Sequence, residues 1–330
     1  MLIKMKKFII NIFIISIALF VVFYAFDKTI TLGLRQSNML IYDNLTKLFN
    51  GKINADLIIN GSSKAYVQLS PRIIDSTLAL NSYNLGLDGT PFIPQKVQYE
   101  LYERYNTPPK IIIQIVDFSN MAKAQGNLYN YSKFAPYINI DIVRQMTKLY
   151  NGFTFIDYHV PLLRYSGMPI EVLDGILSLF NLHIAPSNLY KGYLEQDIPW
   201  DGTFEKFKES YKRGVESKLD TTTCKLFEDY IKRCKEKNIQ LFLVYPPLFY
   251  ESIPYDINRK TMLDYFNKVS LKYSVPFLDY SYDELSFNKG NFYNSQHLNK
   301  IGAELFTKKL CIDIKERNHK DAYKKISKQK

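Results

Sequence analysis

The sequence is poor in the residues that form disulfides and transition-metal sites. It has only three cysteines and four histidines among 330 residues. Cys224 and Cys234 fall on one predicted helix, where ten residues separate the two sulfurs by about 15 Å, too far for a disulfide. None of the histidines stands at a metal-ligand spacing from a cysteine. We therefore expect no disulfide and no metal, and no residue pattern implies an organic cofactor.

Internal repeats and nucleic-acid-binding motifs are also missing. The formal net charge is +11, but much of the excess lies at the two ends of the chain. Three lysines stand near the N-terminus, and a basic tail occupies residues 313–330. Such a tail can bind an anionic polymer, or it can be a solvated, frayed terminus. Without a supporting motif, we expect no nucleic-acid partner.

The longest hydrophobic run lies near the N-terminus. Phe8 to Phe26 are 19 residues in which only Asn11 and Ser16 are polar, enough at ~1.5 Å per residue to span a ~30 Å hydrocarbon core. No small-residue cleavage site follows the run, and no cysteine offers a lipid anchor. The preceding lysines predict a cytoplasmic segment at 1–7 and an extracytoplasmic main domain. We interpret residues 8–26 as an uncleaved signal anchor in the lipid bilayer; a cleaved signal would give the same compartment.

Residues 27–54 are expected to form a membrane-proximal helix and linker. Five short apolar runs then read as buried parallel strands separated by helical patterns. They are residues 56–60, 82–87, 110–116, 239–245 and 275–280. This alternation predicts an α/β domain over 55–312, with a doubly wound, mostly parallel five-stranded sheet. A final helix after His297 would present Leu298, Ile301, Leu305 and Ile312 on one face.

Residues 121–220 interrupt the alternation. The segment is rich in aromatic residues, including Tyr158, Tyr193 and Trp200, and has few strand signals. It is too long for a loop, so we expect a helical insertion or cap. Its aromatic side chains can form the core of the insertion or can stack on sugar rings.

A serine and a histidine are predicted to meet at one edge of the sheet. Ser63 follows the first strand at the start of a helix, and His297 follows the last strand. Because ligands bind beyond the carboxyl ends of parallel strands, the two side chains should converge there. A histidine at that position can act as general base to a serine nucleophile. Taken alone, a serine after Gly61 is more simply a helix cap.

The segments "IINGSSKAY" and "FYNSQHLNKIGAELF" together resemble the SGNH (GDSL-like) hydrolase superfamily, and more narrowly the membrane-anchored bacterial proteins of polysaccharide O-acetylation and teichoic-acid D-alanylation. The resemblance covers roughly residues 55–120 and 235–312. It implies Ser63 as nucleophile and His297 as general base. It also implies oxyanion donors, for which this sequence offers the Ser63 N–H, Gly86 or Gly89, and Asn120.

The sequence departs from the family at the third triad residue, where Asn294 stands in place of an aspartate three residues before His297. In a serine protease an aspartate-to-asparagine change at the equivalent place costs about 10⁴-fold in rate. Three interpretations follow. Asn294 orients His297 in a slow enzyme, Asp279 or Asp283 takes the role, or the site binds without catalysis.

Two functions are therefore expected. The first is an extracytoplasmic esterase or O-acyltransferase that acts on acyl esters of a cell-envelope polysaccharide, with a membrane-bound O-acyltransferase as a partner implied by the resemblance. The second is a catalytically inactive protein that binds glycan or organises a surface-polymer modification complex. The sequence leaves the acyl group and the acceptor open.

Overall fold

The computed structural model describes residues 2–327, and from residue 318 onward only the backbone of the final helix. The chain forms two compact units. The anchor unit contains the chain up to Phe49 together with Gln125–Ser187. The α/β unit contains Asn50–Ala124 and the chain from Asn188 onward.

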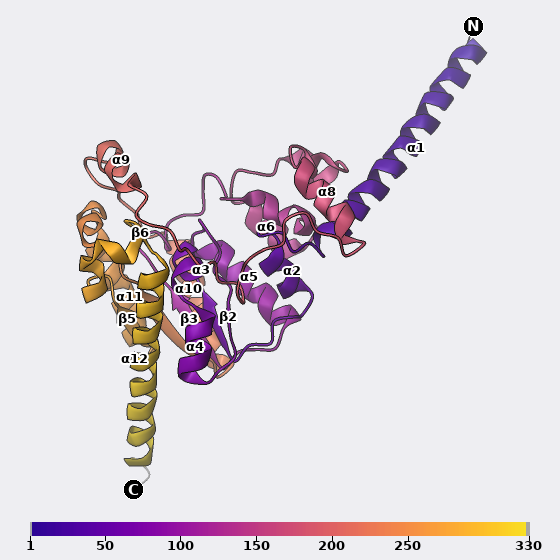
Figure 1. Cartoon of the computed structure of the whole chain (residues 1–330). Coiled ribbons are helices and arrows are strands. Elements are labelled where there is room, and N and C mark those ends of the chain that lie inside the picture. The colour runs from indigo at the N-terminus through magenta and orange to yellow at the C-terminus, as the bar shows by residue number, and fades with distance from the viewer. Residues whose placement is uncertain (1, 328–330) are drawn as a thin grey trace. The chain divides into compact units, whose positions relative to one another are not determined.

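The α/β unit is built on a five-stranded parallel sheet (Figure 1). Its strands are β1 (Leu57–Asn60), β2 (Ser82–Asn84), β3 (Ile111–Ile115), β4 (Gln240–Tyr245) and β5 (Phe277–Asp279). They lie in the order β2-β1-β3-β4-β5, and all four neighbouring pairs are parallel. The five predicted strands and the α/β fold class are thereby confirmed. The chain leaves β1 toward β2 and later returns to its other side as β3, so the point where the order reverses lies between β1 and β3.

Helices cover both faces of this sheet. The helices α3 (Ser63–Gln68), α4 (Pro71–Leu78) and α12 (Lys300–Ser327) pack on one face, where alternate strand residues such as Ile59 and Ile113 join their core. On the other face α10 (Thr221–Glu236) contacts β4, α5 (Phe92–Tyr105) and α11 (Arg259–Tyr273). The period of two along buried strands places successive side chains in these two cores. The sheet is doubly wound, as predicted.

The final helix buries a different face from the predicted one. Ile301, Leu305 and Ile312 are 60%, 48% and 44% exposed. The buried stripe is instead Ala303, Phe306, Leu310, Cys311 and Ile314. Both stripes repeat at three- and four-residue spacing, so periodicity could not choose between them. The residues of the predicted basic tail continue α12 to Ser327, and Lys328–Lys330 lie outside the described residues.

Short elements complete the α/β unit. Three-ten turns η3 (Tyr250–Tyr255), η4 (Glu284–Phe287) and η5 (Lys289–Asn291) follow β4 and β5, and α9 (Thr203–Ser210) precedes α10. An antiparallel hairpin of β6 (Phe292–Asn294) and β7 (His297–Leu298), which the sequence did not predict, comes before α12.

The anchor unit is helical. It comprises α1 (Leu2–Leu34), α2 (Asp43–Phe49), η1 (Tyr131–Tyr137), α6 (Asp141–Thr147), α7 (Phe155–His159), η2 (Leu163–Tyr165) and α8 (Pro169–Ser178). Residues 27–49, which belong to the segment predicted as a membrane-proximal helix and linker, are part of this unit together with 125–187 of the predicted insertion. The rest of that insertion, residues 121–124 and 188–220, belongs to the α/β unit.

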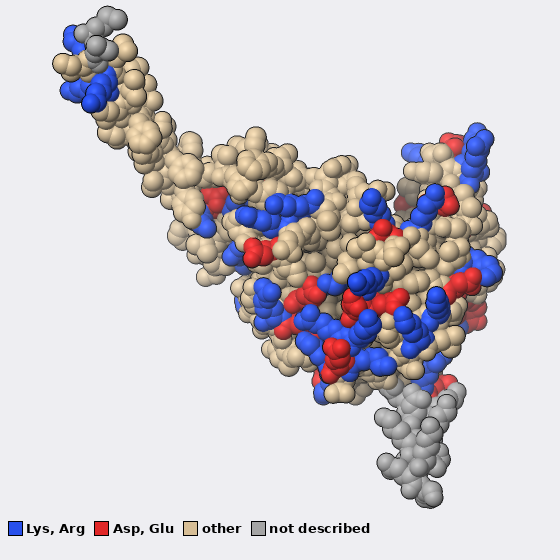
Figure 2. Space-filling model, turned by 180° about the vertical axis from the view of Figure 1, so that it is seen from behind, with Lys and Arg blue, Asp and Glu red and all other residues tan. Residues whose placement is uncertain are grey.

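By length and composition, α1 can cross a membrane. The span Ile3–Leu34 has a mean hydropathy of 2.7 in its most apolar window, and none of that window is buried. Lysines lie at the free end of this helix, and few charged groups are seen along the rest of it (Figure 2).

Candidate active site

The position of Ser63 at the end of β1 is set by a turn that requires glycine at residue 61. Gly61 follows β1 with a φ of +153°, and a Cβ there would lie 2.7 Å from the Ile115 Cβ and 2.9 Å from the Ala65 Cβ. Only a residue without a side chain allows β1, β3 and α3 to approach this closely. Ser62 occupies the helix N-cap position but makes no side-chain cap bond. Its Oγ donates instead to Asp117 Oδ2 at 3.1 Å, so the capping interpretation of this serine pair is wrong.

The β6–β7 hairpin presents the histidine. Its two-residue turn pairs Asn294 with His297 across the hairpin, so residues three apart in sequence face each other. The hairpin is held from two sides. Gln68 Nε2 of α3 donates to the Gln296 carbonyl at 3.0 Å, and the Phe249 N–H donates to the Ser295 carbonyl at 3.2 Å.

The structure brings Ser63, His297 and Asn294 into one hydrogen-bonded chain. Ser63 Oγ lies 2.8 Å from His297 Nε2, and His297 Nδ1 lies 3.0 Å from Asn294 Oδ1. The Gln296 N–H also donates to Asn294 Oδ1 at 3.0 Å, which identifies that atom as the amide oxygen. The oxygen can only accept, so His297 carries its proton on Nδ1. Nε2 then presents its lone pair to the Ser63 hydroxyl, as a general base requires.

The imidazole of His297 is kept neutral by its surroundings. Burial and, to a smaller extent, the positive charge of Lys64 lower the pKa of His297 to about 3, against weaker opposing effects of Asp117 and Asp201. Asn294 contributes no negative charge to stabilise an imidazolium. The arrangement therefore has the geometry of a serine–histidine pair with a weakly basic histidine.

A buried ion pair beside the serine was missed by sequence reasoning. Lys64 Nζ lies 3.5 Å from Asp117 Oδ2, and both side chains are almost fully buried. Burial alone would raise the pKa of Asp117, but Lys64, the N–H and hydroxyl of Ser119 and the hydroxyl of Ser62 outweigh it, so the pKa is lowered. The available signal was position, because Asp117 follows β3 at the point where the strand order reverses.

Lys64 is expected to help keep His297 neutral, as the second cause after burial of its lowered pKa. The imidazole is neutral above its pKa, so in the wild-type chain it should stay neutral down to about pH 4, well below the usual histidine pKa of about 6.5. Lys64→Met removes a cation and should raise the pKa of His297, whereas Lys64→Arg keeps the charge and should leave it low. The four histidines can be followed by NMR after ¹³C labelling of the ring, with His297→Gln assigning the signal. A wild-type His297 that titrates near pH 6.5 would contradict this account.

The three oxyanion candidates differ in their surroundings. The Gly86 N–H already donates to Asn84 Oδ1 at 2.7 Å, so it is not free to bind an oxyanion. Gly89 lies exposed in the turn between β2 and α5. Asn120 is 1% exposed, and its Nδ2 has no hydrogen-bond partner among the described residues. Asn120 Oδ1 accepts the Asp117 N–H at 2.8 Å. The Asn120 side chain is thereby held in the loop after β3 that also carries Asp117.

The two alternative carboxylates are engaged elsewhere. Asp279 Oδ1 accepts from the N–H and hydroxyl of Ser281, and its other oxygen lies 3.8 Å from Arg259. Asp283 caps η4 and pairs with Lys309 at 2.6 Å. The Nδ1 of His297 has Asn294 as its partner, so the structure does not bring either aspartate into the role predicted for it.

The second part of the predicted insertion runs beside the site. The Leu194 N–H donates to the Tyr66 carbonyl of α3 at 3.0 Å, and the Asp201 N–H donates to the Tyr293 carbonyl of β6 at 2.8 Å. The Tyr293 ring in turn stacks on His297, with centroids 5.4 Å apart and planes 8° apart. Residues 194–201 therefore run beside the site, while the half-buried Trp200 ring packs against Phe204 and Phe249.

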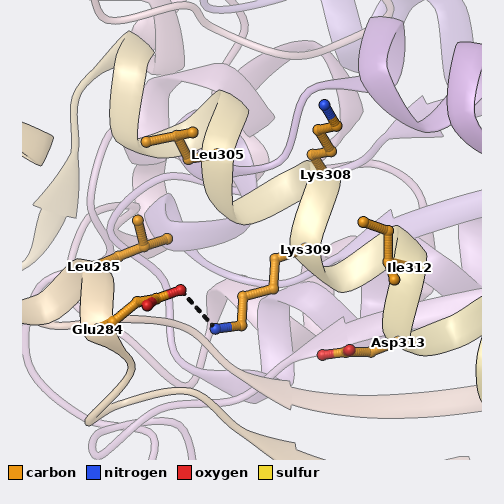
Figure 3. Close-up of a pocket in the computed structure, with 7 residues that line it drawn as sticks. All are labelled: Glu284, Leu285, Leu305, Lys308, Lys309, Ile312 and Asp313. Atoms are coloured by element: carbon orange, nitrogen blue, oxygen red, sulfur yellow. Dashed lines mark hydrogen bonds and ion pairs between the residues drawn. The ribbon is translucent and has the colours of Figure 1, made fainter.

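A separate groove of about 300 Å³ lies between η4 and α12 (Figure 3). It is lined by Glu284, Leu285, Leu305, Lys308, Lys309, Ile312 and Asp313. The apolar residues come in part from the exposed face of α12, and Lys309 crosses the groove to Glu284 at 3.3 Å. Its lining includes neither Ser63 nor His297.

No protein-family model matches this chain, and no curated protein matches it. The structure is similar to the crystal structure of an acetyl xylan esterase, with 12% sequence identity and a TM-score of 0.40 over 77% of this chain and 96% of the other. It is also similar to that of a "putative acylhydrolase" from Bacteroides fragilis, with 10% identity and a TM-score of 0.35 over 78% of this chain and 86% of the other. At such identities the chemistry of the site has to be argued from its own residues.

Proposed function

We propose that this chain is a membrane-anchored, SGNH-like serine esterase or O-acyltransferase. Ser63 Oγ attacks the carbonyl carbon of an acyl ester while His297 Nε2 takes the hydroxyl proton. The proton then passes to the leaving oxygen as the ester C–O bond breaks. Water or a sugar hydroxyl releases the acyl group from Ser63 in a second, equivalent step. The observation that carries this proposal is the 2.8 Å hydrogen bond between Ser63 and His297.

The oxyanion of the tetrahedral intermediate would be stabilised by donors at the same edge of the sheet. The backbone N–H of Ser63 and the unpartnered Asn120 Nδ2 are the donors that the site offers. These donors favour the negatively charged intermediate over the neutral ester, whereas the charge of Lys64 is already paired with Asp117.

The compartment is proposed from the N-terminal helix. The end of α1 is part of the anchor unit, because Ile30 and Leu34 are buried in it and Asp27 pairs with Arg164 at 2.5 Å. These residues lie beyond the apolar run and would remain after cleavage at its end, so the retained anchor is favoured by the lack of a small-residue cleavage site after Phe26. The lysines before the span favour a cytoplasmic N-terminus and an extracytoplasmic α/β unit.

The substrate is proposed to be an acylated, in particular acetylated, cell-envelope polysaccharide. This rests on the resemblance to proteins of polymer acylation and on the anchor, which would keep the site at the cell surface. A membrane-bound O-acyltransferase that supplies the acyl group is the partner that the same resemblance suggests.

A fluorophosphonate probe tests the nucleophile. The full-length chain in detergent is expected to be labelled, and Ser63→Ala should abolish the labelling because the reactive oxygen is removed. Ser76→Ala, at an exposed serine of α4, is the matched control and should be labelled like the wild type. Labelling that persists in Ser63→Ala would overturn the assignment.

A glycan-binding protein without catalysis is the second candidate, and Asn294 is the observation that favours it. In that case the wild-type chain would remain unlabelled, and Ser63→Ala would bind polysaccharide as well as the wild type does.

A further inference from the structure

The anchor unit exposes an apolar surface next to α1. Six of its side chains are Phe155 and Ile156 of α7, Leu163 of η2, Ile170 and Leu173 of α8, and Phe180 just beyond, exposed by 77%, 49%, 43%, 59%, 52% and 71%. We call these residues the apolar face. Large exposed apolar patches of this kind mark interaction surfaces rather than ordinary solvent-exposed protein.

The same segment is almost free of cations. Residues 149–190 contain no lysine and one arginine, in a chain with 43 lysines and arginines. That arginine, Arg164, is buried and paired with Asp27. The segment that carries the apolar face therefore contributes no exposed lysine or arginine of its own, and the nearby cations Arg144 and Lys148 of α6 lie against the Tyr158 ring of α7.

Two groups of contacts set the position of the apolar face along the axis of α1. The first involves Asp27 and Thr31. Asp27, the first residue after the apolar run, accepts the Leu162 N–H at 2.9 Å and pairs with Arg164 at 2.5 Å. Thr31, one turn further, bonds to Arg164 and to the Tyr165 hydroxyl. Leu163 therefore lies at the level at which α1 leaves its apolar run.

The second group of contacts lies where α1 and α8 pack closely at Gly33 and Gly175. A Cβ on Gly33 would lie 1.6 Å from the Gly175 carbonyl oxygen, so the two backbones are in direct contact there. Gly33 is seven residues beyond Phe26, which at 1.5 Å per residue is about 10 Å along the helix. Interfacial helices bury their apolar face about 5–10 Å deep in the headgroup region. The exposed side chains of α8 are thus within reach of that region.

We propose that the apolar face of the anchor unit inserts into the outer surface of the lipid bilayer that α1 spans. The occupant is lipid, because the face is continuous with a helix whose own exposed side chains require lipid and because both groups of contacts hold it at the membrane boundary. The inference rests on the proposed membrane span. If the apolar face inserts, the whole anchor unit lies on the membrane surface, and it does not act only as a flexible link between α1 and the α/β unit.

Tryptophan scanning with brominated lipids tests the insertion. The full-length chain would be reconstituted into phosphatidylcholine vesicles with bromines near the headgroup, as Phe155→Trp and as Phe180→Trp. The emission of each added tryptophan, after subtraction of the wild-type Trp200 signal, is expected to fall about twofold relative to unbrominated vesicles, as for a ring at about 5–10 Å depth. Phe13→Trp, inside the span, is the positive control. Leu271→Trp, at an 82% exposed position of α11 in the α/β unit, is the control for exposure.

The outcomes separate the anchor from the docking. Quenching at 13, 155 and 180 that clearly exceeds quenching at 271 supports the proposal. Quenching at 13 alone overturns the docking while the span stands, and it leaves the apolar face to a membrane-protein partner. No quenching at 13 shows that α1 does not insert, and the docking fails with it.

Discussion

Asn294→Asp is expected to raise the rate of ester hydrolysis by about 10²-fold or more, since the opposite change in a serine protease costs about 10⁴-fold. An aspartate oxygen can accept the same two hydrogen bonds, from Gln296 N–H and His297 Nδ1, that Asn294 Oδ1 accepts now. It adds a negative charge beside the imidazole, which raises the pKa of His297 from about 3 and stabilises the imidazolium that forms in the transition state. A stronger base then removes the Ser63 proton.

The measurement is kcat and kcat/KM for 4-nitrophenyl acetate with the full-length chain in detergent. Asn288→Asp is the matched control, because Asn288 is exposed, caps η5 through its side-chain oxygen and would add the same charge without touching His297. Its rate should equal that of the wild type. Adding Ser63→Ala to Asn294→Asp should abolish the gain. A rate that does not rise, or a rise that survives Ser63→Ala, would contradict the proposed roles of these residues.

Gly61→Ala is expected to destabilise the chain by about 3 kcal/mol or more, through a strained backbone conformation that costs about 1–3 kcal/mol and overpacking of similar cost. The added Cβ would lie 2.7 Å from the Ile115 Cβ and 2.9 Å from the Ala65 Cβ, at a φ of +153°. The turn can relieve these contacts only by moving α3 away from β3. Because α3 begins at Ser63, any folded variant should also lose the 2.8 Å bond to His297 and with it the probe labelling.

Gly202→Ala is the control for the cost of placing a residue with a side chain at a positive φ. Gly202 also has a positive φ, +73°, but a Cβ there would meet nothing within 4 Å. Only the conformational cost remains, about 1–2 kcal/mol. Chemical denaturation of the two variants and the wild type measures the difference. Equal losses for Gly61→Ala and Gly202→Ala would show that the close approach of β1, β3 and α3 is not what Gly61 serves.

The sequence by itself determined the elements that have a strong local pattern. A run of apolar residues between turn residues predicts a buried strand, and all five strands of the sheet were found within a few residues of their predicted ranges. A 19-residue apolar run predicts a membrane-spanning helix. Ser63 and His297 could be placed at one edge because parallel strands share the direction of their carboxyl ends.

Tertiary structure decided everything that depends on which surfaces meet. The partner of His297 was open among Asn294, Asp279 and Asp283 until the β6–β7 hairpin set Asn294 opposite the ring. The pair of Lys64 and Asp117 joins residues from two different strand ends, and no local pattern reveals such a contact.

Contacts between distant residues also explain which helix faces are buried and where the predicted insertion divides. The final helix carries two apolar stripes, and only packing against the sheet selected the one with Phe306. The predicted insertion showed no internal boundary, yet its first part packs with the end of α1 and its second part lines the site. Hydrophobic patterning shows that a side chain is to be buried or paired, but its partner is chosen in three dimensions, by contacts between residues distant in sequence.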